Sequence, residues 1–248
     1  MEKIECPTLG KKNGSKIALT LIVFFLAVSI IVFVNGEPVG PRLIYNKTEE
    51  PGTSTSPLML NHTKASITTL RLNVTQPNKD WKGYVGNVTG KLTLDDAENY
   101  TIYDWTFTTA QGEIYASRGS NIDWSSIVCA NLTHVATEDS ALNHATDEPD
   151  KINDTFKNTT HPEFYVGDTK FTTNKCNYTL YTYVNDSPSN QFPEILLYDE
   201  TNSNLIYTAI VLDSTLGYDN SHYDFQMIVA EDSSTTSNIA YYFYVEVE

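Results

Sequence analysis

Hydrophobic residues follow two patterns along the chain: one long unbroken run near the N-terminus, and many short runs after it. The long run, IALTLIVFFLAVSIIVFV, spans residues 17–34 and is preceded by Lys11, Lys12 and Lys16. Its 18 residues lie at the border between a signal peptide and a membrane span. The tripeptide Val34-Asn35-Gly36 resembles a small-residue cleavage site, so we predict removal of residues 1–36, with a retained signal anchor as the alternative. In either case, the positive-inside rule exports the chain from about residue 37 onward.

A third interpretation of the N-terminus is an archaeal prepilin signal, cut near Lys12-Asn13-Gly14 before the apolar run. Asn13 interrupts the usual basic-Gly junction, which argues against this interpretation. Cys6 lies before the apolar run, so its position excludes bacterial-style lipidation there.

Residues 37–65 contain four prolines among Ser, Thr and Glu and show no apolar period, which predicts an extended linker. From Ser66 onward, short runs rich in Thr, Val, Ile, Tyr and Phe recur between Gly, Asn and Asp turns. These runs predict strands at residues 67–74, 91–94, 100–107, 113–116, 195–198, 205–211 and 241–248.

Two pairs of these runs are predicted to form hairpins: 100–107 with 113–116, and 195–198 with 205–211. A sustained helical period is absent after the leader, although residues 137–144 are long enough for one or two turns. The pattern predicts an all-β fold, an immunoglobulin-like or jelly-roll-type β-sandwich, over residues 66–248. Two half-domains that divide near residue 160 are the alternative.

The charge balance is strongly acidic, with 16 Lys+Arg against 31 Asp+Glu and a formal net charge of -15. Removing residues 1–36 takes away four Lys and two acids, so the exported part carries 12 - 29 = -17. This charge excludes general binding to nucleic acid or to anionic lipid, which needs a basic patch. We therefore expect contact with the membrane only through the N-terminal segment.

Sequons and cysteines agree with export. Cys129 and Cys176 are the two cysteines left after removal of the leader, and an even pair in an exported chain predicts a disulfide. Because the pair is 47 residues apart, its closure stabilises the fold by about 4 kcal/mol in the chain-entropy model. Glycosylation is predicted at ten Asn-x-Ser/Thr sites, although a Thr- and Asn-rich composition also generates such sites by itself. They are Asn46, Asn61, Asn73, Asn87, Asn99, Asn131, Asn153, Asn158, Asn177 and Asn185.

Candidate metal ligands are few. The histidines at positions 62, 134, 144, 161 and 222 are not spaced like the ligands of a metal site. We therefore predict that they are surface loop residues, and we expect no cofactor. Calcium is the alternative, with Asp213, Asp219 and Asp224 around Gly217 and Asp95-Asp96 after a strand. None of these forms an EF-hand pattern, and solvated turn acids are the simpler interpretation.

Candidate catalytic groups are limited to carboxylates near aromatic residues, namely Asp104, Glu113, Asp123 and Glu194, as in a glycosidase. The chain has no nucleophile elbow, His-Glu-x-x-His motif or P-loop, so we predict that it is not an enzyme. Six aromatic residues have two alternative roles: they form a platform that stacks on a sugar, or they pack in the core. They are Trp81, Trp105, Trp124, Tyr84, Tyr103 and Tyr115. The acidic stretch 138–161 is interpreted as an exposed loop tied at its base by the disulfide.

Four stretches together carry a family resemblance: WKGYVGNVTGKLTLDD at 81–96, YDW at 103–105, GEIYA at 112–116 and the terminal YYFYVE. They resemble an uncharacterised family of exported archaeal β-rich cell-surface proteins, over residues 66 to the end. The resemblance implies a small archaeal cell-envelope protein in a lineage where N-glycosylation is usual. It transfers no catalytic residues.

These observations predict an exported cell-surface glycoprotein with a structural or adhesive role, such as a filament or envelope-layer subunit. The extended linker could donate a strand to the open sheet edge of a neighbour, so the expected partners are copies of itself or other envelope proteins. The alternative function is a carbohydrate- or calcium-binding extracellular module.

Overall fold

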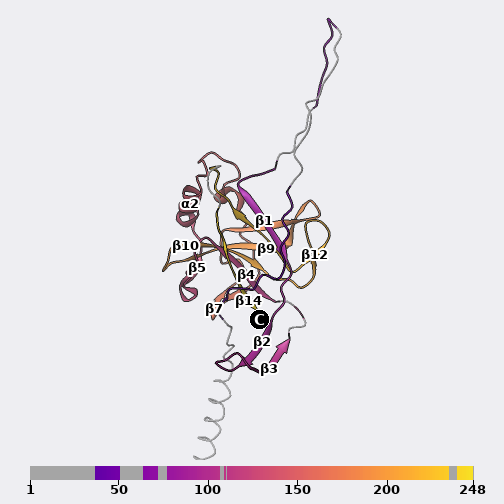
Figure 1. Cartoon of the computed structure of the whole chain (residues 1–248). Coiled ribbons are helices and arrows are strands. Elements are labelled where there is room, and N and C mark those ends of the chain that lie inside the picture. The colour runs from indigo at the N-terminus through magenta and orange to yellow at the C-terminus, as the bar shows by residue number, and fades with distance from the viewer. Residues whose placement is uncertain are drawn as a thin grey trace, which may run out of the picture. The chain divides into compact units, whose positions relative to one another are not determined.

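A computed structural model describes residues 37–50, 64–71, 77–106, 109, 111–234 and 239–247 (Figure 1). The apolar run at 17–34, its cleavage site, Asn61, Asn73, His62 and much of the linker therefore lie outside the described residues. Residues Gly36–Glu248 form one compact unit. Within the described ranges, no helix is both long enough and apolar enough to cross a membrane.

The described part of the chain is mostly β-structure, as the sequence predicts. Its largest element is a six-stranded antiparallel sheet in the order β14-β4-β10-β9-β5, with β8 also paired to β9. The strands of this sheet are β4 (Gly112–Ser117), β5 (Ile127–Cys129), β8 (Thr179–Val184), β9 (Ser187–Asp199), β10 (Asn204–Ile210) and β14 (Tyr242–Val247).

Four smaller antiparallel sheets have two strands each. They are β1 (Trp81–Gly86) with β13 (Phe225–Ala230), β2 (Lys91–Asp95) with β3 (Thr101–Thr106), β6 (Phe164–Val166) with β7 (Thr169–Phe171), and β11 (Thr215–Leu216) with β12 (His222–Tyr223). Among the described residues, three short helices accompany them: η1 (Trp124–Ser126), α2 (Leu132–Ala141) and α3 (Ile152–Thr155).

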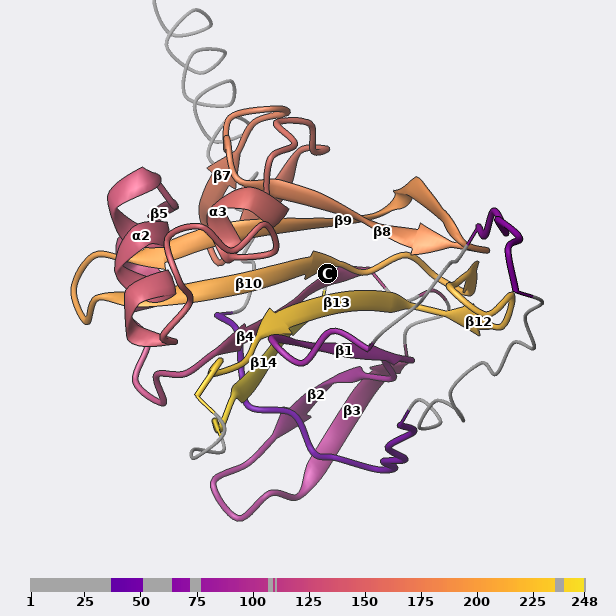
Figure 2. The same cartoon turned by 90° about the horizontal axis from the view of Figure 1, so that it is seen from above.

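Both faces of the six-stranded sheet are buried. Successive side chains of a strand point to opposite faces, so Leu196 and Tyr207 belong to one core while Ile195 and Ile206 belong to the other. The first core is covered by β1, β13 and the helices α2 and α3, which lie beside β9 and β10 in Figure 2. The second core is covered by the β6–β7 hairpin and the indole of Trp124.

Several predicted elements are confirmed. The run 195–198 pairs with 205–211 as the β9–β10 hairpin, with Leu196 opposite Tyr207. Strands also form at 91–95, 101–106, 112–117 and 242–247. Because the loop between β9 and β10 is short, their pairing is a local property that turn residues predict well.

Two strand predictions are wrong. The predicted hairpin of 100–107 with 113–116 does not form, because β3 pairs with β2 while β4 pairs with β10 and β14. The run predicted at 67–74 has no strand over its described residues 67–71, which are exposed.

The helix α2 begins five residues earlier than the predicted turn at 137. Asn131 caps it, since its side chain accepts a hydrogen bond from the backbone N–H of His134 at 3.1 Å. The buried side of the helix includes Glu138 and Asp139 beside Val135. Because two of its buried positions are acidic, the helix lacks the apolar period by which helices are recognised in a sequence.

Candidate functional site

The predicted disulfide is confirmed. Cys129 ends β5 and Cys176 precedes β8, and their Cα atoms lie 5.2 Å apart. The bond therefore encloses α2, α3 and the β6–β7 hairpin, which connect two strands of the same sheet.

The stretch 138–161 inside this loop is not the exposed excursion that its acidity suggests. Ile152 and Phe156 are fully buried and belong to the first core. The buried acidic side chains of this stretch, Glu138 and Asp139, are accommodated because each has a hydrogen-bonded partner of opposite or ionisable character, Arg118 and His144 respectively.

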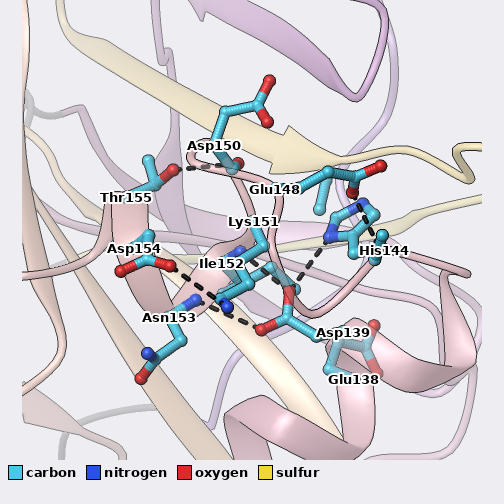
Figure 3. Close-up of polar contacts among 12 residues, drawn as sticks. Glu138, Asp139, His144, Glu148, Asp150, Lys151, Ile152, Asn153, Asp154 and Thr155 are labelled. Carbon is cyan, nitrogen blue, oxygen red and sulfur yellow. Dashed lines mark hydrogen bonds and ion pairs between the residues drawn. The ribbon is translucent and has the colours of Figure 1, made fainter.

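A buried carboxylate organises this region (Figure 3). Asp139 lies near the end of α2, and its Oδ1 is 2.9 Å from Nδ1 of His144. The same carboxylate accepts hydrogen bonds from the backbone N–H groups of Ile152 at 2.8 Å and Asn153 at 3.3 Å. Asp139 thus joins the end of α2, the loop that follows it and the start of α3.

The imidazole of His144 is held between two acceptors. Its Nδ1 faces the Asp139 carboxylate, and its Nε2 lies 2.9 Å from the carbonyl oxygen of Glu231. Burial alone lowers the pKa of His144, but the hydrogen bonds to Asp139 and Glu231 and the negative charge of Asp139 together raise it above its usual value. Since the ring is fully buried and both nitrogens are engaged, this pair fits a structural role and offers no base to a substrate.

A second buried acid on α2 forms an ion pair with a residue outside the helix. Glu138 receives two hydrogen bonds from the guanidinium of Arg118, at 2.6 and 2.7 Å, in a bidentate arrangement. Arg118 follows β4, so the pair fastens α2 to the end of that strand.

The four candidate glycosidase carboxylates do not come together. Asp104 is on β3 and pairs with Lys91, while Asp123 caps η1. Glu113 and Glu194 lie on strands β4 and β9, opposite Ile210 and Ala209 of the strand between them. Adjacent residues of β10 point to opposite faces, so these two carboxylates are on opposite sides of the sheet.

Glu194 is fully buried, on the face of the six-stranded sheet that contributes Leu196 to the first core. Burial raises the pKa of its carboxyl well above the usual value, and only the N–H of Ile228, at 3.0 Å from Oε2, opposes that shift. Its other oxygen has no hydrogen-bond partner among the described residues. The surroundings therefore favour the protonated carboxyl over the ionised carboxylate.

Three histidines differ from the prediction of surface loop residues, whereas His222, on β12, is exposed. His144 and His161 are buried, and His134 stacks on Tyr198 with ring centroids 3.6 Å apart. His161 accepts a hydrogen bond from the N–H of Cys176 and donates one to the carbonyl of Pro162. Sequence spacing does not show these partners, because they come from other segments of the chain.

The candidate calcium acids do not form a cation site. Asp224 is buried, and it accepts hydrogen bonds from the N–H groups of Val88 and Ser214, whereas Asp213 and Asp219 are exposed. Over the described ranges, no group of three or more His, Cys, Asp or Glu side chains is arranged to hold a metal ion.

Eight of the ten sequons lie in described residues, and none of their asparagines is buried. Those of Asn153 and Asn158 are half-buried, and the other six are exposed. Asn131, Asn153 and Asn177 line one open hollow of about 510 Å³ together with Phe156 and Tyr178. These positions are accessible to a glycan.

The aromatic residues do not form one platform. Trp81 packs into the first core and Trp124 into the second, while Tyr115 is fully buried. Trp105 is 52% exposed and contacts Tyr103, which is 59% exposed, with ring centroids 4.8 Å apart.

The exposed pair belongs to an apolar surface on the β2–β3 hairpin. Leu92 lies opposite Trp105 and Leu94 lies opposite Tyr103, so the four side chains share one face. We call these four residues the apolar hairpin face, and each is more than half exposed. The other face carries Lys91 and Asp104, joined by an ion pair of 3.0 Å, together with the exposed side chain of Ile102.

Both edges of this hairpin are open. Each of its strands pairs only with the other among the described residues, so one row of N–H and C=O groups is free on either side. Figures 1 and 2 both draw the hairpin at the periphery of the described structure. A two-stranded hairpin is marginally stable in water, and its apolar side needs a covering layer.

The described start of the linker has a similar character. Val39 forms an antiparallel bridge to Val245 of β14, with N···O distances of 3.0 and 2.9 Å. Beyond it, Leu43, Ile44 and Tyr45 are at least 73% exposed and belong to no helix or strand.

Sequence reasoning missed the apolar hairpin face. Its signal was present as the alternation of 91–94 and 101–106, but the same pattern is typical of a strand that faces a core.

Comparisons of the chain with protein-family models, curated proteins and solved structures found no match.

Proposed function

We propose that this chain is an exported cell-surface glycoprotein with a structural or adhesive role, and that it acts through the apolar hairpin face. The observation that carries the proposal is that four large apolar side chains share an uncovered face on a hairpin with two open edges. Soluble monomers rarely leave such a face bare, and an open strand edge is a template for pairing with another chain.

Other features support the export and glycosylation parts of the proposal. The disulfide is of the kind found in oxidising compartments, and eight sequon asparagines are accessible. We further propose that the six-stranded sheet and the β1–β13 sheet are two layers of a β-sandwich, because Met227 and Val229 of β13 pack with Leu196 and Tyr207.

The test removes the apolar hairpin face while keeping its strands. The variant Leu92→Thr/Leu94→Thr/Tyr103→Thr/Trp105→Thr retains β-branched residues, which favour strands. The matched control Leu132→Thr/Tyr183→Thr/Leu216→Thr/Tyr218→Thr removes four exposed side chains elsewhere.

The full chain is expressed with its leader, recovered from the cell surface or medium, and examined by electron microscopy and sedimentation velocity. We expect filaments, layers or large oligomers for the wild type and the control, and monomers for the hairpin variant. A wild-type protein that stays monomeric and attaches to no cell surface would overturn the proposal. So would a hairpin variant that assembles like the wild type.

Carbohydrate binding is a second candidate function, favoured by the exposed Tyr103–Trp105 pair. Aromatic faces of this kind stack on sugar rings, although Leu92 and Leu94 make the surface more apolar than a polar ligand requires. A glycan array probed with the wild type and with Trp105→Ala tests it. Binding that the substitution abolishes supports this function, and an array without hits excludes it for the glycans tested.

A further inference from the structure

We propose that the apolar hairpin face binds the N-terminal segment of a second copy of this chain, namely residues 40–47. This inference rests on the proposed function and names the partner of the same surface. The contact would be a strand addition, in which the segment pairs with an open edge of the β2–β3 hairpin.

The first argument is the distribution of charge between the linker and the folded part. The linker, residues 37–65, carries three Lys+Arg and three acids, which gives 3 - 3 = 0. The folded part, residues 66–248, carries nine Lys+Arg and 26 acids, which gives 9 - 26 = -17. The net charges of two folded parts therefore repel each other, whereas the linker carries no net charge that opposes the contact.

The same contrast holds for the two proposed partners. The segment 40–47 contains Arg42 and Lys47 and no acid, whereas residues 91–106 contain one Lys and four acids, for 1 - 4 = -3. Lys47 is ion-paired with Glu49, but Arg42 forms no ion pair with any described residue. Arg42 is thus free to approach the acidic turn of the hairpin, at Asp95, Asp96 and Glu98.

The second argument is the pattern of side chains in the segment. In an extended chain Leu43 and Tyr45 point to one side, while Arg42, Ile44 and Asn46 point to the other. Paired with an edge of the hairpin, Leu43 and Tyr45 extend the apolar hairpin face, while Arg42 and Ile44 join the face that carries Lys91, Asp104 and Ile102. The sequon at Asn46 then points away from the apolar contact, so a glycan there is compatible with it.

Face-to-face packing of two hairpins is the competing arrangement, and charge argues against it. It brings a net charge of -3 against a net charge of -3, whereas the segment contains no acid and its Arg42 forms no ion pair with any described residue. The segment is also unoccupied in its own copy, since Val39 anchors its start to β14 while Leu43, Ile44 and Tyr45 remain exposed.

The contact joins two different surfaces of the chain, so it is heterologous. Such head-to-tail contacts produce filaments unless the rotation between copies closes a ring. A filament is therefore the form of assembly that this inference predicts.

The experiment uses two full-length variants that each lack one partner surface. The hairpin variant described above still offers its segment, and Leu43→Ser/Tyr45→Ser still offers its hairpin. Ile67→Ser/Leu70→Ser is the matched control, because it removes two exposed apolar residues outside the segment 40–47. Cooperative unfolding and an unchanged circular dichroism spectrum show that each variant is folded.

We expect each of the two variants to sediment as a monomer, with the assembled fraction reduced by about tenfold or more. Their equimolar mixture should form dimers and stop there, because only one complementary pair of surfaces remains. The control should assemble like the wild type.

Two results would overturn the inference and spare the proposed function: assembly of Leu43→Ser/Tyr45→Ser alone while the hairpin variant is monomeric, or a mixture that stays monomeric although the wild type assembles. Assembly of both variants at the wild-type level would overturn the inference and the proposed function together.

Discussion

The buried imidazole of His144 lies 2.9 Å from the carboxylate of Asp139, and its other nitrogen faces a backbone carbonyl. A neutral imidazole has one N–H and would leave one of these acceptors facing a lone pair. The protonated ring satisfies both, which is why the pKa of His144 is raised in the folded state.

The first prediction concerns the pH dependence of stability. Folding raises the pKa of His144. Its contribution to the stability of the fold is therefore fully present below the pKa of the unfolded chain, about 6.5, and is lost as pH rises through the pKa of the folded state. We expect the free energy of unfolding, measured with urea, to fall over this interval for the wild type. His144→Gln should remove this fall.

His161 provides the contrast for that measurement. Burial lowers the pKa of His161, and its Nε2 accepts a hydrogen bond, so the folded state holds this ring neutral. Its contribution is present above about pH 6.5 and is lost as pH falls, so His161→Gln should flatten the acid side of the curve. Identical pH profiles for the two variants would contradict both assignments.

The second prediction concerns Glu194. Burial raises the pKa of its carboxyl, so Glu194 ionises at a lower pH in the unfolded chain than in the folded one. The wild type therefore loses stability as pH rises above about 4.3. Glu194→Gln should be more stable than the wild type by about 1 to 3 kcal/mol at pH 7 and equal to it at pH 4. Glu163→Gln, at an exposed position, is the control and should show no such difference. A Glu194→Gln protein that is less stable at pH 7 would show that the carboxylate is ionised and needed.

The third prediction concerns the disulfide. Cys129→Ala/Cys176→Ala should lower the free energy of unfolding by about 4 kcal/mol, because the bond closes a long loop in the unfolded chain. Reduction of the wild type in urea should produce a similar loss. A loss below about 1 kcal/mol would show that α2, α3 and the β6–β7 hairpin hold their positions without the bond.

The fourth prediction concerns the contact between β4 and β14. Gly112 has a φ of +125°, and a Cβ there would lie 2.1 Å from the carbonyl oxygen of Glu246. Gly112→Ala should destabilise the fold by about 3 kcal/mol or more, since it adds both backbone strain and a clash. Gly83→Ala in β1 meets no atom within 4 Å and should change stability by less than about 1 kcal/mol. Equal effects of the two substitutions, measured by thermal unfolding, would contradict this placement of β14.

Sequence alone was sufficient where the structure is local or where few choices exist. The β9–β10 hairpin follows from two apolar runs around a polar turn, and β2 follows from an alternating run that ends at Asp95. The disulfide was predicted from the count of cysteines, since the chain has one pair of them after residue 36. The acidity of the folded part and the contrasting charge of the linker are likewise properties of the sequence.

Tertiary structure decided which strands are neighbours and which side chains are buried. Gly112–Ser117 and Thr101–Thr106 are both short runs of six residues with apolar and polar positions, yet the first is a fully buried strand between β14 and β10 and the second is fully exposed. Asp139 and His144 are polar and read as surface residues, but partners from Glu231 and Ile152 make their burial favourable. The physical reason is that periodicity records which side of a strand is apolar, whereas burial and hydrogen bonding depend on segments distant in the chain.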